Sequence, residues 1–305
     1  MDTRALRFFL TGLMLVASAF VRAETLTFGV IGDTPYSPSE EIQFESLLKR
    51  LQNEPLAFLV HVGDFKSGSS LCDDATFAAR KRMFDASAHP FIYVPGDNDW
   101  TDCHRPAAGE FYPPERLDAL RRLFFSTPES LGRRRLPLSR QKAFPENQRW
   151  TRSGVVFMSL HVVGSNNGLS PPVDTMYAAR ERANQDWLAE GFRLAHTTNA
   201  HGIVIFMQAD PRFDLTPGVA ERSGFDNVLA ALEQKTAAWG KPVLLVHGDG
   251  HRFRIDRPLA ERLPHFTRVE TYGSPIVNWV EIDVDPGATG LFLIEPGLLP
   301  GSNEP

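Results

Sequence analysis

The chain has 305 residues, 42% of them hydrophobic, and a formal net charge of −5 at pH 7. This length and apolar content support a sizeable core in one large or two ordinary domains, and they exclude an intrinsically disordered chain. The acidic balance excludes a general nucleic-acid binder, because such a protein needs a basic surface that displaces counterions from phosphates.

Residues 1–23 are typical of an export signal. Two arginines precede an apolar run from Phe8 to Val21, and the run ends in "VRA", with small residues where signal peptidase inspects the chain. The alternative is a membrane anchor, but the run falls short of the roughly 20 apolar residues that a span needs. We therefore expect cleavage after Ala23, a secreted or periplasmic mature chain and no membrane span after signal removal. The loss of three Arg and one Asp with the signal would move the net charge to −7.

From residue 25 onward, apolar runs alternate with segments of helical spacing. The apolar runs are continuous, as expected of strands that are covered on both faces. In chain order the runs are TLTFGVIGD, LAFLVHVGD, FIYVPGDND, GVVFMSLHVV, GIVIFMQADP and KPVLLVHGDGH, and the helical segments are Glu40 to Asn53, Asp74 to Ala86, Glu115 to Phe125, Met176 to Ala195 and Phe225 to Trp239. The alternation predicts a layered α/β fold in which the carboxyl ends of the strands meet at one edge.

The remaining segments are less regular. The segment Ser126 to Arg149, rich in Pro and Arg, is expected to be an irregular surface excursion. After Ile255, "VNWVEIDVD" and "TGLFLIEP" predict two strands at the end of a second sheet. No linker or internal repeat divides the chain, so residues 24–305 are predicted to form a single domain.

Carboxylates follow four of the predicted strands. Four runs end in a Gly-Asp step, at Asp33, Asp64, Asp97 and Asp249. One such step is explained by a turn or a helix cap. Four carboxylates at one edge would repel one another, and at least one pKa would rise unless a cation lay among them. The pattern therefore predicts a site for a divalent metal or a pair of them.

The order and spacing of these motifs resemble the calcineurin-like metallophosphoesterase superfamily. Its pattern is Asp-x-His, Gly-Asp, Gly-Asn-His-Asp/Glu, a lone His and Gly-His-x-His, each at a strand end. This chain has "GDTP" at 32–35, "GD" at 63–64, "GDND" at 96–99, "QADP" at 208–211 and "GDGH" at 248–251. The resemblance covers nearly all of residues 25–296, and it implies a layered αββα sandwich of two mixed sheets flanked by helices.

The chain departs from that pattern at four of the five histidines. Pro35, Asn98, Gln208 and Asp249 stand in their places, and Asp97 replaces the family's Asn. Carried over position by position, the resemblance implies one metal position formed by Asp33, Asp64 and His251, and a second formed by Asp64, Asp97, Gln208 and Asp249. Such oxygen donors favour Mn²⁺ or Mg²⁺, with Ca²⁺ and Fe as further candidates, over Zn²⁺. The number of ions, one or two, stays open, and a metal-free site is the alternative.

Catalytic roles follow from the same comparison. Asn98 stands where the family has the histidine near the leaving group, so general-acid assistance needs another residue. His61, His104 and His247 are candidates, although His61 and His247 lie within apolar runs where a core histidine is the alternative, and a surface role is the alternative for His104. Asp99 is expected to orient Asn98 or a metal ligand, or to be a plain loop carboxylate.

The two cysteines, Cys72 and Cys103, both lie in the part of the chain predicted to be exported. In an oxidising compartment such a pair is expected to form a disulfide. Since they follow Asp64 and Asp97 in neighbouring loops, their disulfide would clamp two loops that carry metal ligands.

The resemblance implies an enzyme that hydrolyses phosphoric monoesters or diesters with the help of a metal. Its substrate would be a small phosphorylated or otherwise anionic molecule. The alternative is an inactive protein that keeps the fold to bind an anionic ligand or a partner. Oligomeric state is not indicated by the sequence.

Overall fold

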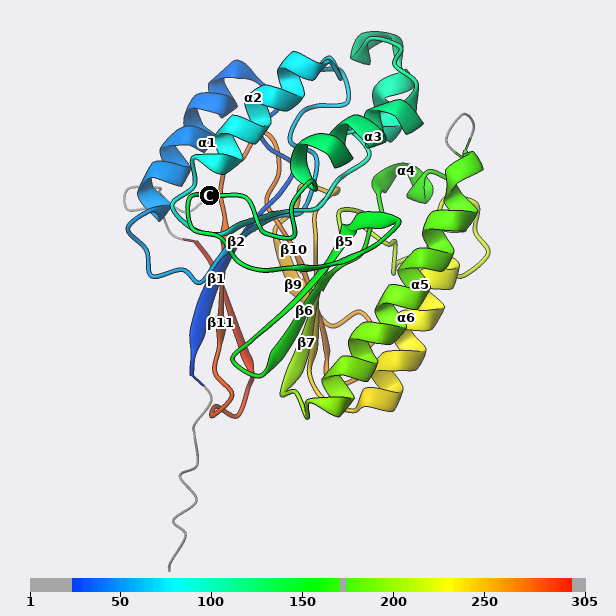
Figure 1. Ribbon diagram of the computed structural model, residues 1–305. Helices are drawn as coiled ribbons and strands as arrows, with labels where there is room; N and C mark the ends of the chain where they lie inside the picture. Colours follow the sequence, from blue (N-terminus) through cyan, green and yellow to red (C-terminus); the bar gives the residue numbers. More distant parts are fainter. Residues whose placement is uncertain (1–23, 171–173, 298–305) are drawn as a thin grey trace, which may run out of the picture.

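The computed structural model describes residues 24–170 and 174–297, so the predicted export signal lies outside the described residues. In it, two mixed sheets stack face to face between two layers of helices (Figure 1). This arrangement confirms the predicted layered α/β sandwich. No helix in the described ranges is both long and apolar enough to cross a membrane.

The first sheet contains the strands nearest the two ends of the described chain, in the order β12-β11-β1-β2-β3. Its strands are β1 (Leu26–Ile31), β2 (Leu59–His61), β3 (Phe91–Tyr93), β11 (Val280–Val284) and β12 (Phe292–Pro296). The two C-terminal strands were expected in a second sheet, and that expectation is wrong. β11 pairs antiparallel with β1, with Phe28 opposite Ile282, so the chain returns to the sheet in which it begins.

The second sheet has the order β4-β5-β6-β7-β8-β10-β9. Its strands are β4 (Ser139–Gln141), β5 (Phe144–Arg152), β6 (Val155–Ser159), β7 (Gly202–Phe206), β8 (Val243–His247), β9 (Arg254–Asp256) and β10 (Phe266–Glu270). β4 and the start of β5 lie in the segment that was expected to be irregular. The sequence does not indicate β5 as a strand, because its buried residues Glu146, Asn147 and Gln148 are polar. The hydrogen-bond partners of these side chains come from elsewhere in the chain.

Helices cover the outer face of each sheet (Figure 1). The first sheet is covered by α1 (Pro38–Leu51), α2 (Asp74–Asp85) and α3 (Pro113–Phe124), and the second by α5 (Asp174–Thr197) and α6 (Asp226–Trp239). Each lies within about two residues of its predicted ends, and side-chain caps mark the starts of α1 and α2. Ser37 accepts a hydrogen bond from the backbone N–H of Glu40, and Asp73 accepts one from that of Thr76. The short turns η1 (Thr101–His104) and η2 (Pro106–Ala108) lie between β3 and α3, and α4 (Gly164–Asn167) follows β6.

Aromatic side chains join the two sheets. Phe28 stacks on Phe58 at 4.9 Å between ring centroids, and it meets Phe157 and Phe206 edge-on at 5.5 and 6.0 Å. All four rings are buried, and each contributes about 1.5–3 kcal/mol. This packing holds the sheets in a fixed relation to each other.

The carboxyl ends of parallel strands from both sheets meet at one edge. β1, β2 and β3 run parallel in the first sheet, as do β6, β7 and β8 in the second. The backbone N–H of Asp249, after β8, donates to Asp33 Oδ2, after β1, at 3.0 Å. Side chains from both sheets therefore share one site.

Candidate metal centre

The Gly-Asp steps turn three carboxylates inward through unusual backbone conformations. Asp33, Asp64 and Asp249 have φ values of 51°, 57° and 75°, in the left-handed region that Asp tolerates better than most residues. A Cβ added to Gly96 would lie 2.0 Å from Asp64 Oδ1, and one added to Gly248 would lie 2.0 Å from Asp33 Oδ2. Both glycines therefore let a carboxylate lie directly against the backbone. Strained residues of this kind concentrate at functional sites.

The four strand-end carboxylates lie in one cluster. Asp97 Oδ1 and Asp249 Oδ1 each lie 2.6 Å from the point that a Cβ on Gly164 would occupy, so both oxygens lie against the same side of this glycine. Asp64 Oδ2 and Asp249 Oδ1 share the Gln208 amide nitrogen as a donor, at 3.2 Å from each. The structure thus brings together acidic residues that are far apart in the sequence.

The cluster is electrostatically unsatisfied. Burial, followed by the charge of Asp249, raises the pKa of Asp33 well above its ordinary value, and burial with the charges of Asp97 and Asp99 does the same to the pKa of Asp64. Burial and the charge of Asp97 raise the pKa of Asp249 to about 8. Asp33 Oδ1 and Asp97 Oδ1 are buried without a hydrogen-bond partner. Each such oxygen is costly unless a donor or a cation contacts it.

No basic side chain of the described residues neutralises this cluster. None of the four carboxylates forms an ion pair with Lys or Arg there, and His251 Nε2 lies 3.7 Å from Asp33 Oδ1. Lys66 is buried nearby, but its ammonium donates to the carbonyls of Ser67 and Ser70 at 3.0 Å. Carboxylate oxygens without a partner are the type of donor that hard divalent cations prefer.

The cluster is not arranged as a finished metal site. In residues 24–170 and 174–297, no three His, Cys, Asp or Glu side chains are placed to hold a metal ion together. Two neutral groups, the Gln208 amide and the Tyr36 hydroxyl, lie among the carboxylates instead.

The orientation of Gln208 differs from its expected role as an oxygen ligand. The backbone N–H of Gly164 donates to Gln208 Oε1 at 2.6 Å. Because an N–H cannot accept, this contact turns the amide nitrogen toward Asp64 and Asp249. Gln208 therefore partly screens the two carboxylates as a donor, and it does not offer them an oxygen to share with a metal.

Tyr36 is a residue of the site that sequence reasoning missed. Its hydroxyl donates to Asp64 Oδ2 at 3.2 Å, lies 3.4 Å from His251 Nε2 and accepts from Asn98 Nδ2 at 3.0 Å. The available signal was its place in "GDTPY", one residue after the Pro35 that stands where the family has a histidine.

His251 is oriented so that one ring nitrogen faces the cluster. Its Nδ1 lies 2.9 Å from the carbonyl of Ser274, so Nδ1 carries the proton and donates it. Ser274 in turn donates through Oγ to Glu40 Oε1 at 2.9 Å. This arrangement leaves Nε2 toward Asp33 and Tyr36, as is usual for histidines that bind metals.

Asp99 acts on the backbone of the loops and not on Asn98. Its carboxylate accepts from the N–H groups of Asp64, Phe65 and Gly96 at 2.8 to 3.0 Å and from the Tyr93 hydroxyl at 2.7 Å. Burial raises its pKa to about 6. Asp99 thus ties the loop after β2 to the loop after β3.

We expect Asp99→Asn to lower the free energy of unfolding by about 3 kcal/mol, because its amide would turn a donor toward backbone donors. Urea unfolding at pH 7 measures this. Asp118, which is exposed on α3, provides the matched variant Asp118→Asn with no expected change. An Asp99→Asn protein as stable as the wild type would contradict the role assigned to this carboxylate.

His61 is not placed to act as an acid. Its Nε2 lies 2.8 Å from the carbonyl of Thr34, and its Nδ1 accepts from the N–H of Gly63 at 3.3 Å, so both ring nitrogens are engaged. Burial lowers its pKa to about 4, so the ring is neutral near pH 7. His61 is therefore a core histidine, which was the alternative to a catalytic role. Its two hydrogen bonds hold the loops that carry Asp33 and Asp64.

The other two candidate acids also have structural partners. His104 is exposed in η1, with Nδ1 2.7 Å from the carbonyl of Thr101. His247 is buried on β8, its Nδ1 lies 2.8 Å from the carbonyl of Gly248, and burial lowers its pKa to about 4. Asn98 itself is in the site, where its backbone N–H donates to Asp64 Oδ1 at 3.0 Å.

Ser165 is a second residue of the site that the sequence did not indicate. Its hydroxyl donates to Asp97 Oδ2 at 2.7 Å from the loop after β6, with a left-handed φ of 51°. The side chain is exposed, so this contact lies at the mouth of the cluster.

The predicted disulfide is confirmed. Cys72 and Cys103 are bonded, with 5.7 Å between their Cα atoms, and both are buried. The bond joins the loop after β2 to η1, next to the backbone of Asn98 and Asp99. It therefore clamps the two loops that carry Asp64 and Asp97.

Replacement of both cysteines by Ala is expected to lower the free energy of unfolding by about 3–4 kcal/mol, because the bond closes a loop with a sequence separation of 31. Urea unfolding tests this value. A reducing agent should destabilise the wild type similarly and leave the double variant unchanged. A loss below about 1 kcal/mol would show that the clamp matters little.

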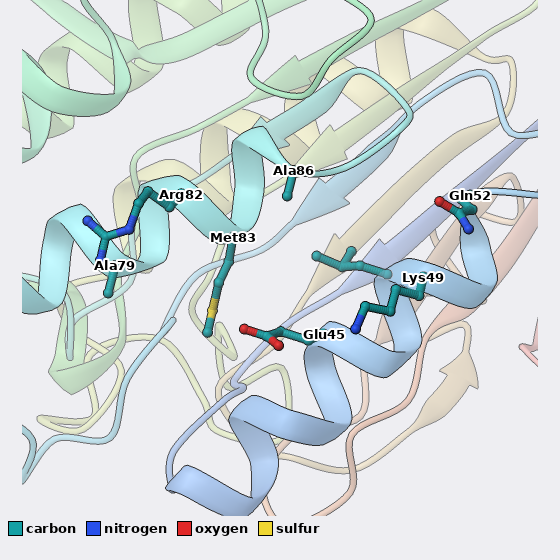
Figure 2. Close-up of a pocket in the computed structure, with 8 residues that line it drawn as sticks. Glu45, Lys49, Gln52, Ala79, Arg82, Met83 and Ala86 are labelled. Carbon is teal, nitrogen blue, oxygen red and sulfur yellow. The ribbon is translucent and has the colours of Figure 1, made fainter.

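A separate groove lies on the outer surface between α1 and α2 (Figure 2). It is lined by Glu45, Leu48, Lys49, Gln52, Ala79, Arg82, Met83 and Ala86. It shares no residue with the carboxylate cluster.

Comparisons with known proteins agree with the fold. Neither a family model nor a curated protein matches the sequence. Among solved structures, the chain is similar to a dimetal phosphatase from Danio rerio, with 11% identity, a TM-score of 0.57, and coverage of 89% of this chain and 95% of that one.

Two further structures have lower TM-scores, and we draw nothing from them. A phosphopantetheinyl hydrolase from Mycobacterium tuberculosis has 15% identity, a TM-score of 0.45 and coverage of 92% and 98% of the two chains. A 5'-nucleotidase from Candida albicans has 12% identity, a TM-score of 0.45 and coverage of 88% of this chain and 50% of that one. The similarity to the dimetal phosphatase shows that the two chains share a fold, which agrees with the resemblance of the motif spacing to the calcineurin-like metallophosphoesterases.

Proposed function

We propose that the chain is an exported, metal-dependent phosphoric ester hydrolase with an oxygen-rich site. One observation carries this proposal: buried carboxylates from both sheets converge without a Lys or Arg partner in the described part of the chain, and two of their oxygens have no partner. Asp33, Asp64, Asp97, Asp249 and His251 would hold the cation. When bound, it would neutralise charge on the phosphoryl group and acidify the attacking water.

Residues of the chain supply the remaining chemistry. The Asn98 amide, which contacts Tyr36, and the Ser165 hydroxyl, which contacts Asp97, lie beside the carboxylates and would donate to a bound phosphoryl group. His61 cannot act as the acid in the place of Asn98, since both of its ring nitrogens are engaged. Esters with good leaving groups, which need no proton donor, should therefore react best.

The test uses the mature chain. Bound metal is measured by mass spectrometry, and hydrolysis of para-nitrophenyl phosphate and bis-para-nitrophenyl phosphate is followed with Mn²⁺, Mg²⁺, Ca²⁺ or Fe²⁺ and with a chelator. We expect turnover that requires the cation, and faster hydrolysis of nitrophenyl esters than of alkyl esters. Absence of both metal binding and turnover would refute the proposal. Sequencing the amino terminus of the exported protein would test cleavage after Ala23.

The second candidate is a protein that binds an anion without turnover. The two neutral donors within the cluster, Tyr36 and Gln208, favour it, because they partly satisfy the carboxylates without any metal. Saturable binding of inorganic phosphate in the presence of a chelator, with no hydrolysis under any condition, would support this function over the first.

A further inference from the structure

The hydroxyl of Tyr36 lies between two groups that the family pattern assigns to one metal. It contacts Asp64 Oδ2 at 3.2 Å and His251 Nε2 at 3.4 Å. The third member of that set, Asp33, lies 3.7 Å from the same histidine nitrogen through Oδ1. A neutral oxygen of the chain thus contacts two of the three groups of the expected metal position.

Tyr36 is held in this place from several sides. Its backbone N–H donates to Glu40 Oε2 at 2.8 Å, and its ring meets the His251 ring edge-on at 5.3 Å. Glu40 also accepts from Ser274, whose carbonyl holds His251. The same carboxylate therefore fixes both Tyr36 and His251, and Asn98 adds a hydrogen bond to the hydroxyl.

A cation at that point and this hydroxyl compete for the same two atoms. An ion bound by Asp64 Oδ2 and His251 Nε2 would have to replace the contacts that the Tyr36 hydroxyl makes with both of them.

We propose that the Tyr36 hydroxyl takes the place of one of the two metal ions implied by the motif pattern, so that the chain binds a single divalent cation. This inference rests on the proposed function, because it assumes that the cluster binds a cation. The remaining ion belongs to the side of the cluster where Asp97 Oδ1 and Asp249 Oδ1 both lie against Gly164.

The test counts cations. Wild type, Tyr36→Phe and the control Tyr112→Phe, whose side chain is exposed, are titrated with Mn²⁺ by calorimetry, and bound metal is measured after gel filtration. We expect one equivalent for the wild type and the control, and two for Tyr36→Phe. Two equivalents on the wild type, or one on Tyr36→Phe, would overturn the inference and leave the proposed function standing. No binding by any of the three would overturn both.

A measurement on the wild type alone does not depend on the folding of the variant. Electron paramagnetic resonance of the Mn²⁺-loaded protein should show the resolved hyperfine pattern of an isolated ion. The broadened spectrum of an exchange-coupled pair at saturating Mn²⁺ would overturn the inference, because it requires two ions that share a ligand.

Discussion

Asp64→Asn is expected to lower both turnover and Mn²⁺ affinity by at least about 100-fold, because it removes the charge at the centre of the cluster. Asp64 is buried and contacts Tyr36, Asn98 and Gln208 through both carboxylate oxygens. The amide has the same shape, so the loops should keep their positions. Steady-state kinetics with para-nitrophenyl phosphate and Mn²⁺ titration by calorimetry measure the two effects.

Asp118→Asn is the matched control, since Asp118 is exposed on α3 and outside the cluster. It should leave both quantities unchanged. Circular dichroism of both variants would show whether they are folded. Turnover within about tenfold of wild type in a folded Asp64→Asn protein would remove this carboxylate from the proposed mechanism.

The metal-free protein is expected to lose stability as the pH rises from about 5 to 8. The folded-state pKa values of Asp99, Asp102 and Asp249 are raised, to about 6, 7 and 8, with burial as the first cause. A carboxyl with a raised pKa stabilises the fold below its unfolded pKa of about 4, and this contribution is lost as the pH rises through the folded pKa. Each such group contributes a loss of about 1.4 kcal/mol per pH unit between its unfolded pKa and its own folded pKa.

Urea unfolding in a chelator across this pH range measures the loss. Added Mn²⁺ should restore stability, and the gain should be larger at pH 8 than at pH 5, because a cation competes with protons for the carboxylates. Asp249→Asn should show a shallower pH dependence in the chelator. Metal-free stability that stays level or increases with pH would contradict the description of the cluster as a set of buried, mutually repelling carboxylates.

The fold and the convergence of the acidic residues could be predicted from local features. Continuous apolar runs indicate strands covered on both faces, and the glycine before each aspartate allows a close approach of backbone and carboxylate, as Gly96 and Gly248 show. The disulfide could be predicted because only two cysteines exist, in neighbouring loops. The strand β5 could not be predicted, because its buried polar residues form hydrogen bonds with side chains or backbone of other segments.

The roles of individual polar side chains depend on partners from distant parts of the chain. Gln208 and His61 have side chains that could serve a metal site, but Gly164 turns the amide of Gln208, and Thr34 and Gly63 engage both nitrogens of His61. No sequence pattern singled out Tyr36, whose hydroxyl contacts both Asp64 and His251 in the fold.

The sequence by itself therefore determined the layered architecture, the edge at which the strands end and the excess of carboxylates there, because each follows from the order of residues along one strand or loop. Only the tertiary structure decided which polar atoms face those carboxylates. The physical reason is that a hydrogen-bonding group is directed by the nearest available partner in space, and at this site those partners come from both sheets.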